Sequence, residues 1–331
     1  MPLAVIATCH CLLVSEELNV YLRLTRDFNA GRPRALLAGG QAVVLYRLAI
    51  MSKDGDWILR EDEETLQHVL GVLAAYGARY RFGAPLALPW MRGGWSAHFE
   101  FPHEGLRVRT DFVTRPPRLD QEVLAEMWRE QECHPPEPEE AKLQTAHLIL
   151  TKQTNREKDY AAIGELARLL EDPGAALRYS RSARDILEIS ARHPELLAAA
   201  QQNRPCLVAV GQGREALAAA LDAERRGLMA LNEERLERYE QAARDWSAVW
   251  PAVQKEVGSL PLPEAHARLV AAAAGCLPTA VPEVSLVAQD HGRRIPQRRR
   301  PRFANPEFRR TQPGVECLAS SGAGDQRPGP Q

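Results

Sequence analysis

Long apolar runs and an imbalance of charge are both missing from this 331-residue sequence. No stretch reaches the roughly 20 apolar residues that a membrane-spanning helix needs. The 42 Lys and Arg residues nearly match the 43 Asp and Glu residues, so the chain as a whole has no charge that would attract nucleic acid or an anionic membrane. The apolar segment 3–14 lacks the basic residues and the cleavage site of a secretory signal. We therefore expect a cytoplasmic protein with no membrane partner.

Paired cysteines are missing as well. The six cysteines are scattered, without a Cys-x-x-Cys pair or the histidine spacing of a zinc site. Only Cys9 and Cys11, on either side of His10, lie close together, and these three residues leave a tetrahedral site incomplete. The sequence predicts neither a disulfide framework nor a structural zinc ion.

Changes in composition divide the chain into four segments. Residues 1–29 hold an N-terminal segment with an amphipathic helix that begins after Ser15. Residues 30–170 alternate between strand and helix patterns, and residues 171–278 are dominated by the helix formers Ala, Leu, Glu and Arg. Residues 279–331 are rich in Pro, Gly, Arg and Ser and predict a disordered tail. The sequence therefore predicts an α/β domain, a helical domain and a tail.

The pattern in the second segment predicts a mixed sheet flanked by helices, in the α+β or α/β class. An apolar strand at 35–38 meets the glycine pair Gly39 and Gly40, after which helical spacing resumes over 41–48. Other strands are expected at 56–59, 79–82, 96–101 and 106–113, with a helix over 62–76 and a hairpin turn at 103–105.

Three aspartates carry the strongest chemical signal. Asp54 and Asp56 alternate with Gly55 where a strand begins, so their side chains point to the same face of the sheet. Asp111 lies in the apolar strand 106–113, where an unpaired charge would be costly. If the two strands are neighbours, the three carboxylates would bind two Mg²⁺ ions, which prefer oxygen ligands. An Asp-x-Asp pair alone is commonly a pair of surface acids, but the ordered set of glycine turn, paired acids and strand acid favours a metal site.

Two stretches resemble the signature of the DNA polymerase β-like nucleotidyltransferase superfamily, and most closely its small bacterial members of the minimal and abortive-infection toxin type. They are Leu37-Ala38-Gly39-Gly40 and Ser52-Lys53-Asp54-Gly55-Asp56-Trp57. The resemblance implies a nucleotidyltransferase-type sheet in which Asp54 and Asp56 bind both Mg²⁺ ions and Asp111 completes the catalytic ion. It covers residues 30–170.

This resemblance also implies a nucleotide-binding set. A basic element opens the helix after the sheet, where Lys152 and either Arg156 or Lys158 would meet the phosphates and Asp159 would orient them. Glycines at the strand–helix turn let the backbone approach a triphosphate. The set is Gly39, Gly40, Lys53, Lys152, Arg156, Lys158 and Asp159. The implied reaction moves a nucleoside monophosphate from a nucleoside triphosphate such as ATP to a protein, RNA, DNA or small-molecule acceptor and releases pyrophosphate.

Two positions depart from the family pattern. Gly55 stands where the family usually has an apolar residue, and Gln41 stands where a hydroxyl or small residue is common. An inactive binding or regulatory module, of the kind found in toxin–antitoxin pairs, is therefore an alternative to the enzyme. Residues 293–310 contain eight arginines and predict either a weak nucleic-acid contact or a solvated tail.

Several other side chains have two interpretations. His98 is either a base or a hydrogen-bonded structural residue. The aromatic residues Trp90, Trp95 and Phe101 either line a nucleobase pocket or belong to the core. Arg107 and Arg109 either bind phosphate or are solvated charges on the sheet face.

Overall fold

The computed structural model of the protein describes residues 19–281. The predicted helix start at Ser15, the Cys9-His10-Cys11 cluster and nearly all of the predicted tail, with its arginines at 293–310, lie outside these residues. Within residues 19–281, no helix combines the length and the apolar character that crossing a membrane requires.

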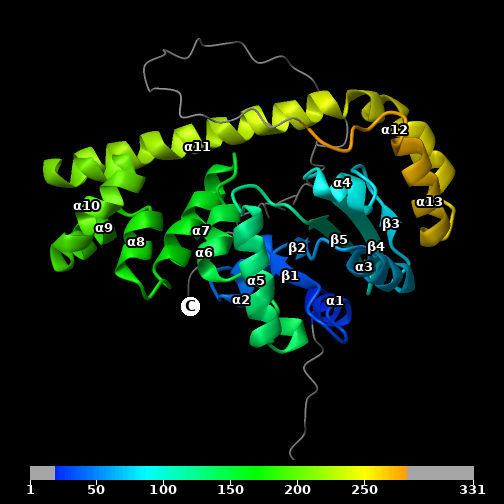
Figure 1. Ribbon diagram of the computed structural model, residues 1–331, viewed down its shortest axis with the longest axis horizontal. Helices are drawn as coiled ribbons and strands as arrows, with labels where there is room; N and C mark the ends of the chain where they lie inside the picture. The colour runs from blue at the N-terminus through cyan, green and yellow to red at the C-terminus, as the bar shows by residue number, and fades with distance from the viewer. Residues whose placement is uncertain (1–18, 282–331) are drawn as a thin grey trace, which may run out of the picture. The chain divides into compact units, whose positions relative to one another are not determined.

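Five strands form one mixed sheet in the order β1-β2-β5-β4-β3 (Figure 1). The strands are β1 (Ala35–Ala38), β2 (Asp54–Leu59), β3 (Arg79–Tyr80), β4 (Ala97–His103) and β5 (Leu106–Val113). Strands β2 and β5 run parallel, and the other neighbouring pairs are antiparallel. The predicted fold class, a mixed sheet flanked by helices and followed by a mainly helical part, is confirmed.

The hairpin between β4 and β5 shows how local sequence sets this topology. His103 pairs with Leu106, which leaves Glu104 and Gly105 as a two-residue turn with φ angles of 51° and 77°. Positive φ at both central residues is typical of the turn type that matches the twist of the flanking strands. The predicted hairpin turn is confirmed, and it places β4 beside Asp111.

Helices cover both faces of the sheet and pack into two separate clusters of buried residues. The first cluster contains side chains from α1 (Val20–Phe28), α3 (Glu63–Ala75), α4 (Leu88–Arg92), α12 (Arg244–Val257) and α13 (Leu262–Ala273). The second contains side chains from α2 (Gly39–Leu45), α5 (Gln121–Cys133), α6 (Thr145–Thr151) and α7 (Glu157–Ala167). The short 3-10 helix η1 (Pro138–Glu140) lies between α5 and α6 in the chain.

A third cluster lies in the helical part. It joins α8 (Pro173–Tyr179), α9 (Ala183–Arg192), α10 (Pro194–Asn203), the 3-10 helix η2 (Pro205–Gln212) and α11 (Arg214–Ala242). Helix α11 is 29 residues long and contributes to all three clusters in turn. Its residues Leu217 and Leu221 belong to the third cluster, Leu228 packs against the second and Tyr239 packs against the first.

The starts of α1 and α3 are capped by polar side chains. The Asp62 side chain accepts a hydrogen bond from the Thr65 amide and begins α3, as the sequence predicts. Helix α1 begins at Val20, and the side chain of its N-cap residue Asn19 accepts a hydrogen bond from the Tyr21 amide. The predicted start after Ser15 lies outside the described residues.

The last two helices pack on the same face of the sheet as the N-terminal helix. Trp246 and Trp250 of α12 are buried in the first cluster, and the Trp246 Nε1 atom donates to the Gly83 carbonyl oxygen at 2.9 Å. Residues 244–273 therefore help to bury the sheet, although the sequence places them in a separate helical domain. The division at residue 170 stays a prediction.

Candidate active site

The sheet has one polar patch on the face that α2, α5, α6 and α7 cover in part. Along β2, Ile58 packs in the second cluster, whereas Trp57 and Leu59 pack in the first. Because side chains alternate along a strand, Asp54 and Asp56 share the face of Ile58. Both aspartates precede Ile58, which is the first β2 side chain on this face to pack in the second cluster. Both are half-buried.

Asp56 and Asp111 are register partners on the parallel strands β2 and β5. The structure therefore brings together the acids that the sequence predicts from separate stretches. Burial, followed by the charge of Asp111, raises the pKa of Asp56 to about 6. The charge of Asp54 adds to this rise, and the charges of Lys152 and Arg156 oppose it. Such mutual repulsion is relieved when a cation binds between carboxylates.

Gly39 and Gly40 open α2 directly beside these acids. A Cβ atom on Gly39, whose φ is 57°, would overlap with the Asp56 Oδ2 atom, and a Cβ on Gly40 would overlap with the Ser52 hydroxyl. The close approach of the turn to the acidic strand thus requires both glycines. The sequence predicts the turn, and the structure gives its steric reason.

Gly55 has its own steric role, on the opposite face. A Cβ there would overlap with the rings of Trp57 and Tyr21, which fill the space in the first cluster. Gly55 therefore leaves room for two large aromatic rings on the face away from Asp54 and Asp56.

Asp111 is held by two basic side chains. Its Oδ1 atom accepts hydrogen bonds from the Arg81 guanidinium at 2.5 Å and from His98 Nδ1 at 2.7 Å. The other ring nitrogen of His98 lies 2.8 Å from the Ser96 hydroxyl oxygen. Burial alone would raise the pKa of the Asp111 carboxyl, but His98 and Arg81 outweigh burial and hold the pKa below its usual value. His98 is thus hydrogen-bonded, and a role as a base stays a prediction.

Arg81 was not predicted as a site residue. The alternation of exposed Arg79, buried Tyr80 and Arg81 is a signal that the sequence does contain, since it places Arg81 on the same side of the edge strand as Arg79. Its partner Asp111 lies on β5, two strands away from β3, and only the register of β3, β4 and β5 reveals the contact.

The donor set suits Mg²⁺, although no complete cage is formed. Among residues 19–281, no group of three or more His, Cys, Asp or Glu side chains is arranged to hold a metal ion. The Asp54 Oδ1 atom is buried and has no hydrogen-bond partner, so it is an oxygen in need of a cation or a donor. Mg²⁺ is usually bound by one or two carboxylates together with water and substrate phosphates. By donor type, Asp54 and Asp56 fit this ion.

The predicted phosphate-binding element forms a tight cluster around Asp159. Its carboxylate meets Lys152 Nζ at 3.4 Å and accepts hydrogen bonds from Arg156 Nε at 2.8 Å and the Thr154 hydroxyl at 2.6 Å. Burial would raise the pKa of Asp159, but these neighbours, Lys152 first, lower it below its usual value. Asp159 therefore contacts both Lys152 and Arg156, and the phosphate-binding role of this element stays a prediction.

Comparisons with known proteins add a single likeness. No family model and no curated protein sequence matches the chain. A crystal structure titled as a putative nucleotidyltransferase from H. pylori is similar over 64% of this chain and 94% of its own, at 13% sequence identity and a TM-score of 0.31. A likeness at this level says nothing about individual site residues.

The other candidates fall into three groups. Lys53 and Lys158 are exposed, and neither is among the strongest charges that act on Asp56. Arg109 is the register partner of Asp54, whereas Arg107 pairs with Glu100 at 2.5 Å. The aromatic residues Trp90, Trp95 and Phe101 are buried in the first cluster, which confirms the core interpretation.

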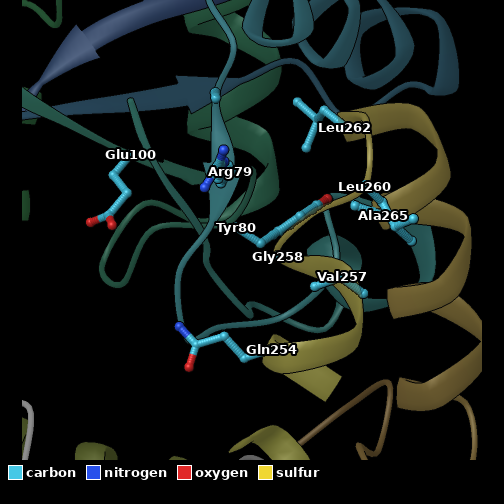
Figure 2. A pocket seen from close by; sticks show the side chains of 10 residues that line it. Arg79, Tyr80, Glu100, Gln254, Val257, Gly258, Leu260, Leu262 and Ala265 are labelled. Carbon is cyan, nitrogen blue, oxygen red and sulfur yellow. The ribbon is translucent and has the colours of Figure 1, made fainter. Parts of the chain in front are cut away.

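A cavity of about 190 Å³ lies away from the acids, between the sheet edge and the last two helices. Figure 2 shows Arg79 and Glu100 on the strand side and Val257, Leu262 and Ala265 on the helix side. The Tyr80 hydroxyl bonds to His266 Nδ1 at 2.7 Å, which fixes the helix side against β3. None of the three aspartates lines this cavity.

Proposed function

We propose that the protein is a Mg²⁺-dependent nucleotidyltransferase that moves a nucleoside monophosphate from a nucleoside triphosphate to an acceptor. The observation that carries the proposal is the pairing of Asp56 with Asp111 on parallel strands, beside Asp54 and within the field of Lys152 and Arg156. Acids that repel one another next to fixed cations suit the joint binding of metal ions and phosphates.

Asp54 and Asp56 would hold the ion, which supplies positive charge to the reacting phosphates when it is bound. Both basic partners of Asp111 bond to its Oδ1 atom, so its Oδ2 atom would be the further oxygen ligand for the ion. Lys152 and Arg156 would bind the triphosphate, while Asp159 keeps their charges in place.

In the proposed reaction an acceptor oxygen attacks the α-phosphorus as the bond to the bridging oxygen breaks. The proton of the acceptor is released, and the bond electrons leave with pyrophosphate. Positioning and charge neutralisation supply most of the catalysis in such reactions. The proposed acceptor is a protein, a nucleic acid or a small molecule. A role of the toxin type is part of the same proposal.

A second candidate is a binding module with an inactive site. The observation that favours it is the engagement of Asp111 by Arg81 and His98 in place of a third metal-facing carboxylate. Such a module would bind a protein partner through its helical part and would show no magnesium-dependent nucleotide binding.

Calorimetry with each nucleoside triphosphate, with and without Mg²⁺, separates the two candidates. The enzyme is expected to bind a triphosphate more tightly with Mg²⁺ than without it, and to release pyrophosphate when an acceptor is present. Asp56→Asn should remove magnesium-dependent binding and transfer, while Glu233→Gln, an exposed acid on α11, should leave both unchanged. Transfer that survives in Asp56→Asn would overturn the proposed metal site, whereas an unchanged protein that binds no triphosphate with Mg²⁺ would favour the binding module.

A further inference from the structure

Arg118 has an unusual backbone for an arginine. It lies in the loop between β5 and α5, seven residues after Asp111, and adopts a φ of 70°. Residues other than glycine rarely adopt this left-handed region, and the strain is commonly found where a side chain is held for a function. The side chain is half-buried, so an entering ligand can still reach it.

The guanidinium of Arg118 has only neutral partners. It donates to the Asn232 Oδ1 atom at 2.5 Å and weakly to the Leu150 carbonyl oxygen at 3.4 Å. Among residues 19–281, no carboxylate forms an ion pair with it. A half-buried cation without an anionic partner is costly unless a ligand supplies the negative charge.

A second arginine adds to this cost. Arg235 lies one turn after Asn232 on α11, with its guanidinium 4.7 Å from the centre of the Tyr239 ring. Burial lowers the pKa of Arg118, and the positive charge of Arg235 lowers it further. Arg235 likewise has no ion pair with a carboxylate among the described residues. Both arginines thus lie beside Asn232, one bonded to its amide oxygen and the other one turn further along α11, and their like charges repel.

Asn232 fixes the position of the pair. It is only 7% exposed, and its Nδ2 atom donates to the carbonyl oxygens of Gln153 at 2.7 Å and Leu228 at 2.8 Å. Its amide oxygen is thereby left to orient Arg118. Gln153 directly follows Lys152, so the same amide ties the arginine pair to the element that carries Lys152.

We propose that Arg118 and Arg235 form a phosphate-binding site, which takes a phosphate group of a nucleotide or of a nucleic-acid acceptor. The planar guanidinium forks match phosphate geometry and remain charged at every physiological pH. A phosphate between them would supply the missing negative charge and cancel the repulsion. Neither arginine belongs to the set that the sequence resemblance implies.

The test measures binding of inorganic pyrophosphate to the full-length protein by calorimetry in EDTA. Arg118→Gln and Arg235→Gln are each expected to weaken pyrophosphate binding at least about tenfold, because each removes charged hydrogen bonds. Arg118→Lys should fall between Arg118→Gln and the unchanged protein, since it keeps the charge but loses the fork. Arg226→Gln is the matched control, because Arg226 lies on α11 and already pairs with Asp222. Equal affinity in all variants would overturn the proposal.

A purely structural role of Arg118 predicts a different result. If Arg118 only fastens α11 through Asn232, Arg118→Gln should lower the melting temperature, and Arg235→Gln should leave pyrophosphate affinity unchanged. The Arg235→Gln variant keeps the test decisive even if Arg118→Gln fails to fold.

Competition identifies the source of the phosphate. A nucleoside triphosphate or a short single-stranded oligonucleotide with a 5′-phosphate is added to the pyrophosphate complex in EDTA. Displacement by the triphosphate assigns the site to the nucleotide, and displacement by the oligonucleotide alone assigns it to a nucleic-acid acceptor. If neither displaces pyrophosphate, the proposal is wrong.

The outcome is independent of the transfer reaction. Arg118→Gln and Arg235→Gln should weaken pyrophosphate binding in EDTA in the Asp56→Asn background as well, because no metal takes part. The phosphate site and the proposed catalysis can therefore fail separately.

Discussion

A single missing Cβ atom decides whether Asp56 has room beside the strand–helix turn. Gly39→Ala would push a methyl group into the Asp56 carboxylate and strain a backbone with a φ of 57°. We expect this variant to lose nearly all magnesium-dependent nucleotide binding, as measured by calorimetry. Gly71→Ala is the control, because Gly71 lies exposed in α3 with open space around it. That change should stabilise the protein by about 0.5–1 kcal/mol, and equal loss of binding in both variants would contradict the role of Gly39.

The raised pKa of Asp56 predicts a dependence of stability on pH. In the unfolded chain the Asp56 carboxyl ionises near its ordinary pKa of 3.8, whereas in the folded protein its pKa is raised to about 6. Folding therefore binds a proton between these values, and the metal-free fold loses stability as the pH rises through this window.

Asp56→Asn removes the buried charge, so in EDTA at pH 7.5 it should raise the melting temperature by a few degrees, on the scale of about 2–4 °C per kcal/mol for a chain of this size. The gain should disappear below the unfolded pKa, where both forms are neutral. Differential scanning calorimetry at pH 3.5 and pH 7.5 measures both values. A lower melting temperature of the variant at pH 7.5 would contradict the repulsion between the acids.

The sequence alone predicts the three aspartates of the site, but not the side chains that bond to them. Asp54, Asp56 and Asp111 follow from strand alternation and the glycine turn, which are local patterns. The bonds of Arg81 and His98 to Asp111 depend on the register of three strands, and the Asn232 bond to Arg118 depends on how α11 packs. Contacts between distant segments leave no local pattern to read.

At the scale of elements, a buried ion pair joins the helices of the third cluster. Arg204 is 4% exposed, donates to the Leu177 carbonyl oxygen at 2.7 Å and meets both carboxylate oxygens of Glu224 at 2.9 and 3.0 Å. Arg181 pairs with the same carboxylate. Burial would raise the pKa of Glu224, but Arg204 and Arg181 outweigh burial and lower the pKa below its usual value.

Removing the charge of Glu224 leaves two buried cations unpaired. Glu224→Gln should cost about 3–5 kcal/mol of unfolding free energy, the usual loss when one partner of a buried pair is removed. Urea denaturation at pH 7 measures it, with Glu188→Gln as the control for an exposed pair with Arg192. Because the folded pKa is lowered, the stabilisation is present above the unfolded pKa and is lost as the pH falls through the folded value. A cost below about 1 kcal/mol would show that Arg204 finds another partner.

The strands and the long helices were predictable because their periodicity is regular. β1, β5, α3 and the hairpin turn appear in the structure close to where the sequence places them. The short helix α4 was missed, since its five residues span little more than one turn and begin with a proline-containing segment. The cap of α1 depends on one hydrogen bond, from the Tyr21 amide to the Asn19 side chain, which periodicity does not reveal.

On the scale of the whole molecule, the C-terminal helices complete the core that the N-terminal half begins. Trp246 is 1% exposed and packs 5.5 Å from the Trp250 ring, with its indole bonded to Gly83. Composition alone could not show this, because a helix that packs on a sheet and one that packs in a bundle share the same apolar periodicity.

Trp246→Ala should therefore destabilise the entire protein and not only its last helices. We expect a loss of about 3–5 kcal/mol from the cavity and the lost burial. Urea denaturation followed by circular dichroism measures it, with Val249→Ala as the control, since Val249 is 40% exposed and should change stability by less than about 0.5 kcal/mol. A variant that keeps its midpoint would show that the first core closes without α12.

Helix α11 couples the three buried clusters to one another. Because one uninterrupted helix supplies side chains to every buried cluster, bending or fraying at its centre would disturb neighbours on either side at once. A phosphate bound by Arg118 and Arg235 would stiffen the middle of α11. It would thus make the first and third clusters more rigid as well, although the ligand does not touch them.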